Sequence, residues 1–309
     1  MTETVERESF SLSVPEGQGW RKRMRNILWR VLSPLPDRLY LSLKYRVIVG
    51  RWPDIDQPRT FTEKVQARKL RDRNPLYATI VDKSAAKPYV AGLVGDEHVI
   101  RACWTGTDLA EVDWDALPYP VVIKPTHASG LGAFLYTRQD AAEFARNGEL
   151  ATSWLAVDHA RYNREWAYSQ VKPQLLIEQM LLFGGGIPWD YRVFVFAGRV
   201  SHICLDIRKD NRGYAATYSA DWEKLPFYDP DYLPLYSGDV ARPANLDLMV
   251  QIAETLGAGM DFVRVDLYSD GEQIFVGELT LYPGGGFERF DPPEYDLIIG
   301  NKWPDGKLG

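Results

Sequence analysis

The stretch VRVDLYSDGEQIFVGELTLYPGGGF, residues 263–287, constrains the fold more than any other part of the chain. Two short apolar segments flank a Ser-Asp-Gly turn, which predicts an antiparallel strand pair. Side chains alternate between the two faces of a strand, so Asp266 shares a face with Arg264 and Tyr268. On the second strand Glu278 shares a face with Val276 and Thr280. The two carboxylates share one face only if the turn holds an odd number of residues, and we predict such a turn because three-residue hairpins with glycine are common.

The rest of the chain predicts further helices and strands. Helical spacing or capping residues mark the segments 37–50, 60–74, 82–95, 139–147, 149–157 and 243–257. Apolar runs predict strands at 98–104, 119–125, 133–137, 173–181 and 189–207, the last folding back near Gly198. Thr60 and Glu63 fit a capping box, Asp82 is a candidate N-cap, and Pro243 is expected at a helix start. This order predicts the α+β class with mixed, largely antiparallel sheets.

Composition narrows the class of protein. The chain has 309 residues, of which 45% are hydrophobic and 25% charged, enough for one large domain or two to three small ones. A formal net charge of −6 argues against a general nucleic-acid binder. Cys103 and Cys204 form no CxxC pair and are too few for a disulfide framework. No apolar run reaches about 18 residues, and the first 19 residues lack the apolar core of a signal peptide, so we expect a cytoplasmic protein.

The N-terminal region has two parts. Residues 1–19 are polar, and we expect them to be disordered. The segment WRKRMRNILWRVL, residues 20–32, predicts a helix with apolar residues on one side and basic residues, among them Arg21, Lys22, Arg25 and Arg30, around the rest. One interpretation is peripheral contact with an anionic membrane surface. The other is a helix docked on the protein with its basic face in water.

Two lysines are candidates for binding an anion. Lys124 ends the apolar strand YPVVIK, where burial is costly unless an anion meets the ammonium group. The loop HASGLG, residues 127–132, is small enough for backbone N–H groups to approach phosphates. Lys83 stands where a helix is expected to begin, so a phosphate there would also meet the helix N-terminus. A lysine head in water is the alternative interpretation for Lys124.

The carboxylates of the opening strand pair are candidates for a metal site. Asp266 and Glu278 on one face, next to Thr280, would suit a hard cation. Mg²⁺ usually takes one or two protein carboxylates plus substrate phosphates. An acid pair on the solvent face of a hairpin is the alternative. In DYRVFVF, Asp190 and Arg192 share a strand face, and the planar fork of arginine suits anion recognition.

Taken in order, these features look like those of an ATP-grasp enzyme. The segments FTEKVQARKLRDRNPLYATIVDK, KPTHASG, REWAYSQVKPQLLIEQML, FVRVDLY and GELTLYPGGGF resemble the TupA-like ATP-grasp family, named for teichuronopeptide biosynthesis. The resemblance covers roughly residues 35–290. It implies two α+β subdomains whose sheets grip ATP, preceded by a helical N-terminal region. We place the helical region at 20–82 and the two subdomains at 83–182 and 183–309.

The resemblance also implies roles for individual residues. The expected ATP-binding residues are Lys83, Lys124, His127, Ser129, Gly130, Gly132, Glu178, Gln179, Met180 and Leu181. Of these, the lysines would bind phosphates, the loop residues would cover them, and residues 178–181 would frame adenine and ribose. Mg²⁺, or Mn²⁺ in its place, would be held by Asp266 and Glu278. The expected catalytic residues are Arg192 and Arg264, and the expected substrate-binding residues are Asp190, Thr280, Gly284, Gly285 and Gly286.

This resemblance implies an ATP-dependent carboxylate–amine ligase that works through an acyl phosphate, in polysaccharide or natural-product biosynthesis. Its partners would be a small-molecule carboxylate and an amine, such as an amino acid, a sugar acid or a peptide. Two other functions stay open. One is an ATP-grasp kinase that phosphorylates a hydroxyl group. The other is a glycosyltransferase, for which Asp229-Pro230-Asp231 has a DxD spacing, although the same residues suit an acidic turn.

Overall fold

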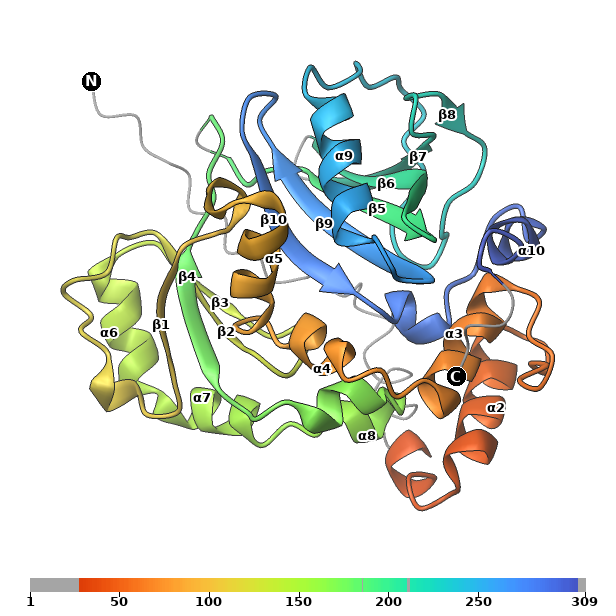
Figure 1. Ribbon diagram of the computed structural model, residues 1–309. Helices are drawn as coiled ribbons and strands as arrows, with labels where there is room; N and C mark the ends of the chain where they lie inside the picture. Colours follow the sequence, from red (N-terminus) through yellow and green to blue (C-terminus); the bar gives the residue numbers. More distant parts are fainter. Residues whose placement is uncertain (1–27, 185, 210–211, 305–309) are drawn as a thin grey trace.

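The computed structural model describes residues 28–184, 186–209 and 212–304 (Figure 1). The disorder expected at residues 1–19 and the helix expected at 20–27 lie outside these ranges. Residues 28–31 are helical, as expected for the end of that segment. None of the described helices has the length and apolar character needed to cross a bilayer.

Two antiparallel sheets form the framework. The smaller has the strand order β1 (Ala102–Gly106), β4 (Leu175–Gln179), β2 (Val121–Pro125) and β3 (Ala133–Leu135). The larger has the order β10 (Ile274–Thr280), β9 (Phe262–Ser269), β5 (Asp190–Phe196), β6 (Arg199–Lys209), β7 (Arg212–Tyr218) and β8 (Lys224–Leu225). Every strand pair within the two sheets is antiparallel. The predicted α+β class is therefore confirmed.

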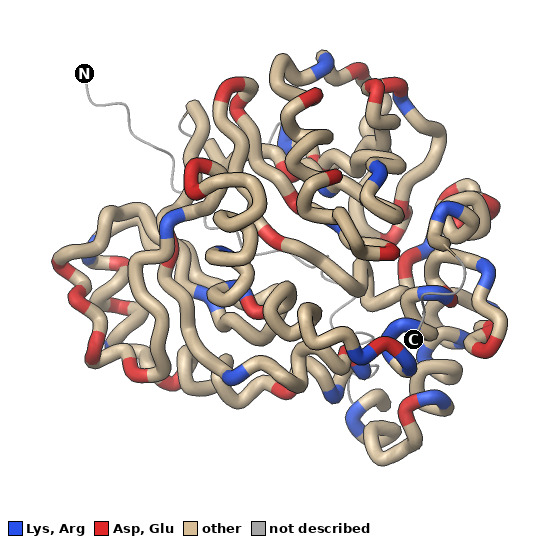
Figure 2. The backbone as a smooth tube through the Cα atoms, in the orientation of Figure 1, with Lys and Arg blue, Asp and Glu red and all other residues tan. Residues whose placement is uncertain are grey.

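The labelled helices lie around the two sheets (Figure 1). They are α2 (Asp37–Ile48), α3 (Phe61–Arg71), α4 (Leu76–Val81), α5 (Ala86–Val94), α6 (Arg138–Arg146), α7 (Gly148–Leu155), α8 (His159–Asn163), α9 (Leu246–Leu256) and α10 (Tyr295–Gly300). Short 3₁₀ turns are η1 (Asp96–His98), η2 (Leu109–Glu111), η3 (Trp166–Gln170) and η4 (Pro283–Gly286). Helices α6 and α7 pack on the smaller sheet, and α9 packs on the larger one (Figure 1). Basic residues gather around α2 and α3, and acidic residues at the far end near α6 (Figure 2).

Some predicted helix and strand boundaries are wrong by a few residues. Thr60 and Glu63 form the predicted capping box of α3. Helix α5, however, begins at Ala86, and Asp82 accepts the backbone N–H groups of Ser84 and Ala85 in the turn before it. Lys83 therefore precedes the helix and is not at its N-terminus. Strand β1 begins four residues after His98 because η1 occupies 96–98, and α9 begins three residues after Pro243.

The β9–β10 turn corrects the opening prediction. Ser269 pairs with Ile274, so the turn holds the four residues 270–273 and not an odd number. A β-bulge between Val276 and Glu278 then shifts the register by one residue and places Glu278 opposite Asp266. The predicted shared face is thus correct, but the bulge produces it and the turn does not.

The larger sheet buries one face completely and the other only in part. Val193, Val195 and Val265 lie on the face that α9 covers, and all three are buried. On the opposite face, Phe194 and Phe262 contact the ring of Phe61 in α3. Further along the same strands, charged residues lie on this same face, because side chains of alternate residues point to one side. This part of the face lines cavities and lies toward the smaller sheet.

Candidate active site

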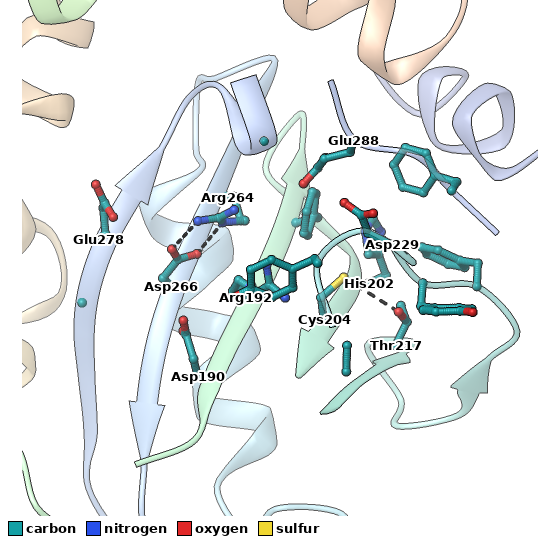
Figure 3. Close-up of a pocket in the computed structure, with 18 of the residues that line it drawn as sticks. Asp190, Arg192, His202, Cys204, Thr217, Asp229, Arg264, Asp266, Glu278 and Glu288 are labelled. Atoms are coloured by element: carbon teal, nitrogen blue, oxygen red, sulfur yellow. Dashed lines mark hydrogen bonds and ion pairs between the residues drawn. The ribbon is translucent and has the colours of Figure 1, made fainter. Parts of the chain in front are cut away.

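Two connected cavities lie between and beside the sheets. One, of about 350 Å³, lies over β5, β6, β7, β9 and β10 and is shown in Figure 3. The other, of about 530 Å³, lies between the two sheets. Five residues line both cavities: Lys83, Lys124, Asp190, Tyr232 and Tyr268. The two cavities therefore form one cleft, and we call them the sheet cavity and the intersheet cavity.

Strand register arranges the charged residues in rows across the larger sheet. One row runs directly across five strands: Glu278, Asp266, Arg192, Cys204 and Thr217. The next row toward the aromatic core is Thr280, Arg264, Phe194 and His202, and the next row away from it is Tyr268, Asp190, Asp206 and Ala215. Because alternate residues of each strand share a face, all three rows face the same side. The register thus brings residues that are far apart in sequence into one site.

Arg264 and Asp266 form a two-pronged ion pair in the cleft. Arg264 Nε and Nη2 each donate to one carboxylate oxygen of Asp266, both at 2.6 Å, and Nη2 also donates to Thr280 Oγ1 at 3.0 Å (Figure 3). Burial lowers the pKa of Arg264, but the attraction of Asp266 outweighs it, so the net shift is upward. The guanidinium therefore stays charged. Thr280 contacts this ion pair. Among the described residues that line the two cavities, Thr280 is not found.

Glu278 is held by Lys83. The Lys83 Nζ lies 3.2 Å from Glu278 Oε1 and donates to the Ala128 carbonyl oxygen at 3.0 Å. Burial raises the pKa of Glu278, but Lys83, Arg264 and Lys124 together bring it below its ordinary value. The carboxylate is therefore ionised and surrounded by cations. Lys83 also contacts the loop that follows β2, through the Ala128 carbonyl oxygen.

Glu178 joins two lysines at the floor of the intersheet cavity. Lys124 pairs with Oε1, and Lys87 Nζ lies 2.7 Å from Oε2. Burial raises the pKa of Glu178, and the two lysines lower it further than burial raises it. Both carboxylate oxygens are thus engaged by lysines. Sequence reasoning missed Lys87, which α5 brings to this pair from outside the predicted motifs.

Some of the residues expected to bind ATP line the intersheet cavity, and others do not. Gln179, Met180, Leu181, Gly130 and Gly132 line the intersheet cavity. Ser129 Oγ lies 3.4 Å from the Tyr168 hydroxyl. His127 is buried and does not line either cavity among the described residues, and burial lowers its pKa. The position of His127 therefore gives no support to its expected contact with ATP.

The triglycine turn is fixed from behind by α3. Gly284 lines the sheet cavity. The carbonyl oxygen of Gly285 accepts from Gln66 Nε2 at 3.0 Å and Lys69 Nζ at 2.5 Å. The Gly285 N–H donates to the Tyr282 carbonyl oxygen within the turn. Gly285 and Gly286 do not line either cavity among the described residues. Of the three glycines, Gly284 is therefore the one that lines the cleft.

Asp190 is a buried carboxyl group of the cleft that lies close to two other carboxylates. Its Oδ1 is buried and has no hydrogen-bond partner among the described residues. Burial raises the pKa of Asp190 to about 8, and the nearby Asp266 and Asp206 raise it as well. Asp266 and Asp206 are already paired with Arg264 and Arg192, so the nearby arginines are engaged by the other two carboxylates. The described residues contain no cluster of three or more His, Cys, Asp or Glu suited to a metal ion, so a Mg²⁺ held by Asp266 and Glu278 would take further ligands from bound phosphate or water.

Arg192 occupies the centre of the sheet cavity. It pairs with Asp206, and its guanidinium carbon lies 4.3 Å from the centre of the Tyr232 ring. The Tyr232 hydroxyl donates to Asp206 Oδ2 at 2.6 Å. Sequence reasoning missed both partners, and also Glu288, which lines this cavity just after the triglycine turn. Of these three residues, only Glu288 could have been suspected from the sequence, because it is a carboxylate four residues beyond Gly284 in the triglycine motif.

Several solved structures are similar to this chain over much of its length. The D-alanine–D-alanine ligase from Bacillus anthracis is 14% identical, with 72% of this chain and 65% of that chain covered and a TM-score of 0.43. A RimK domain protein ATP-grasp from Sphaerobacter thermophilus is 14% identical, with 75% and 70% covered and a TM-score of 0.41. The ATP-grasp ligase PsnB, complexed with a phosphomimetic variant of its minimal precursor, Mg and ADP, is 15% identical, with 92% and 72% covered and a TM-score of 0.39. This chain thus spans less than two thirds of the length of the Bacillus anthracis ligase.

No curated protein matches the chain. The model of one family, TupA-like ATPgrasp, matches residues 63–303, which is well over half of the sequence. This match includes both sheets and all the cleft residues described above. The chain belongs to the TupA-like ATP-grasp family.

Proposed function

We propose that this protein is an ATP-dependent ligase that joins a carboxylate to an amine. The observation that carries the proposal is the opposed pair Asp266 and Glu278, set beside Lys83 and Lys124 where the two cavities meet. Two carboxylates for a hard cation and two lysines for phosphates are the groups that phosphoryl transfer requires. Membership of the ATP-grasp family supports the same chemistry.

ATP is proposed to lie in the intersheet cavity. Its adenine would lie against residues 179–181, and the loop with Gly130 and Gly132 would cover the phosphates. Lys83 and Lys124 would bind phosphate oxygens, exchanging part of their present pairing with Glu278 and Glu178 for the new anion. Each lysine would keep an anionic partner during this exchange, because a phosphate oxygen replaces a carboxylate oxygen. When bound at Asp266 and Glu278, Mg²⁺ would neutralise charge on the two terminal phosphates.

The proposed reaction has two steps. A substrate carboxylate oxygen attacks the γ-phosphorus, and the bond from that phosphorus to the bridging oxygen breaks, so ADP leaves and an acyl phosphate forms. The amine nitrogen then attacks the acyl carbon, inorganic phosphate leaves, and the nitrogen loses a proton to give an amide. Arg264 and Arg192 line the cavity beside the phosphate end and would orient the carboxylate and balance its charge.

The test uses hydroxylamine in place of the unknown amine. The purified protein is incubated with ATP, Mg²⁺, hydroxylamine and a panel of amino acids, sugar acids and short peptides. A hydroxamate from one carboxylate is the expected result, together with equal ADP, and it should disappear in Glu278→Gln. ADP with a phosphorylated alcohol and no hydroxamate would replace the ligase by the kinase alternative. Equal ADP release from the wild type and Glu278→Gln would contradict the proposed site.

The DxD residues favour the acidic-turn interpretation over a sugar-nucleotide site. Both carboxylate oxygens of Asp231 are bonded to Arg289, and Asp229 Oδ1 accepts the Asp231 backbone N–H at 2.9 Å. Asp231 lines neither cavity among the described residues. Only Asp229 lines the sheet cavity, so the two residues do not present a shared metal site.

A further inference from the structure

The part of the sheet cavity farthest from Lys83 and Lys124 has a chemistry that the proposed reaction does not yet explain. We propose that it is the subsite for the amine substrate: Glu288 and Asp229 receive the ammonium group, and an aromatic wall receives an apolar or aromatic body. This inference rests on the proposed function, because it assigns the second substrate of that reaction. Figure 3 shows Glu288 and Asp229 on the opposite side of Arg264 from Glu278.

The wall of this subsite is neutral and largely aromatic. Phe194, Phe227 and Phe290 line it together with His202. The ring of His202 stacks on Phe194 with 4.3 Å between the centres, and burial lowers the pKa of His202 to about 3, so it is uncharged at neutral pH. Such a wall favours a hydrocarbon or aromatic group over a sugar, whose hydroxyls would lose water without gaining partners.

The arginines around the subsite already have carboxylate partners. Arg192 pairs with Asp206, Arg264 with Asp266, and Arg289 with Asp231. Glu288 and Asp229 form no ion pair with another described residue, and Glu288 Oε2 is buried without a hydrogen-bond partner. Since the positive charges are matched and these two carboxylates are not, this end of the cavity is complementary to a cation.

The triglycine turn holds Glu288 in place. A Cβ on Gly284 would lie 2.3 Å from Glu288 Cγ, so the Glu288 side chain packs directly over the backbone of Gly284. Gly284 also has φ = +53°, a conformation that favours glycine. The turn therefore presents the carboxylate to the cavity beside Arg264, next to the place where the acyl group would react.

The electrostatics of Glu288 agree with an unfilled cation subsite. Burial raises the pKa of Glu288 to about 7. Arg264 and Arg192 lower it, while Asp229 and Asp296 raise it further. A bound ammonium group would supply the missing positive charge and stabilise the ionised carboxylate.

The test compares three probes of one shape by calorimetric titration of the full chain at pH 8, where Glu288 is mostly ionised. The probes are 2-phenylethylamine, 2-phenylethanol and 3-phenylpropanoate. We expect the amine to bind about tenfold tighter than the alcohol, and the propanoate to bind weakest, because a charge-assisted hydrogen bond forms only with the amine. In Glu288→Gln the preference for amine over alcohol should fall to about twofold. In Phe290→Ala both should weaken while the preference stays.

A second measurement tests the proposed function separately from the amine subsite. Binding of Mg²⁺ and ADP is measured on the same proteins, and Glu288→Gln and the exposed-site variant Glu272→Gln should both keep it. No binding of Mg²⁺ and ADP would contradict the proposed function, whereas the probes report the subsite alone. Propanoate binding as tightly as the amine, an amine preference unchanged in Glu288→Gln, or no binding of any probe would each overturn the amine subsite.

Discussion

Glu278 lies directly across from Asp266, although the turn that joins their strands holds an even number of residues. The bulge at Gly277 restores the shared face, and a Cβ on Gly277 would lie only 2.6 Å from Tyr268 Cε2. The Tyr268 ring thus occupies the space that any side chain at 277 would need. Bulges beside active sites often aim a side chain, and here the bulge aims a carboxylate at the cleft.

Gly277→Ala should therefore damage the site through its geometry. The added methyl group must displace the Tyr268 ring, and crowding of this kind costs about 1–3 kcal/mol. We expect binding of Mg²⁺ and ADP to weaken at least tenfold, measured by calorimetric titration, with a lower midpoint of urea unfolding. Gly148→Ala is the matched control because its added Cβ meets nothing within 4 Å. Equal affinity in Gly277→Ala and the wild type would show that the bulge does not position the carboxylates.

Glu278→Gln should weaken divalent cation binding. The amide keeps the shape of the side chain but removes the negative charge from one of the two proposed ligands. We expect Mn²⁺ affinity in the presence of ADP to fall at least tenfold, measured by electron paramagnetic resonance of free Mn²⁺. The rate of ADP formation should fall by about two orders of magnitude, as for loss of one preorganised electrostatic group. Glu272→Gln, on the exposed turn of the same hairpin, should leave both values unchanged. Unaltered Mn²⁺ binding in Glu278→Gln would remove Glu278 from the metal site.

Glu178→Gln should destabilise the fold, because it leaves Lys87 and Lys124 partly buried without their shared carboxylate. Breaking a buried ion pair by removing one partner costs about 3–5 kcal/mol, and we expect a loss toward the lower end since neither lysine side chain is completely buried. The folded-state pKa of Glu178 is lowered, so its stabilisation is present above the unfolded pKa and is lost as the pH falls. Urea unfolding should thus show a large difference from the wild type at pH 7 and a small one near pH 4. The exposed-site variant Glu111→Gln should match the wild type at both values. A difference that grows toward acid would contradict this account.

Glu288→Gln should have the opposite dependence on pH. The folded-state pKa of Glu288 is raised to about 7, above its unfolded value, so the folded state favours the protonated carboxyl group. The stabilisation is present below the unfolded pKa and is lost as the pH rises through 7. The wild type and Glu288→Gln should unfold alike at pH 4, and the variant should be more stable by roughly 2 kcal/mol at pH 8.5, in urea unfolding without divalent cations. A variant less stable than the wild type at pH 8.5 would show that Glu288 already has a cationic partner.

Lys69→Met should loosen the triglycine turn. Lys69 is buried, burial lowers its pKa to about 8, and its ammonium group donates to the Gly285 carbonyl oxygen. Methionine fills a similar volume but cannot donate, so the Gly285 carbonyl keeps only Gln66. We expect faster amide hydrogen exchange in residues 284–288 and a smaller amine preference in the probe titration. Lys172→Met, at an exposed site, is the control. Exchange rates equal to the wild type would show that Lys69 does not support the turn.

Local patterns predicted the larger part of this architecture. Alternation of apolar and polar residues along 263–269 and 274–280 identified the two strands and the faces of Asp266 and Arg264, because side-chain period is a local property of the backbone. Thr60 and Glu63 were predictable for the same reason, since a capping box involves residues only three apart. The spaced motifs also indicated the family that the family model confirms.

Contacts between distant segments were decided by the tertiary structure. Lys87 meets Glu178 across 91 positions of sequence, and Arg192 meets Asp206 because of strand register, which no local pattern specifies. The bulge at Gly277 could not be predicted from the sequence either, since the one-residue shift in register between β9 and β10 depends on how Tyr268 packs. The sequence by itself determined which residues form strands and which residues of one strand share a face. Packing between strands and helices far apart in the chain decided which charges meet, because ion pairs and bulges are set by long-range register.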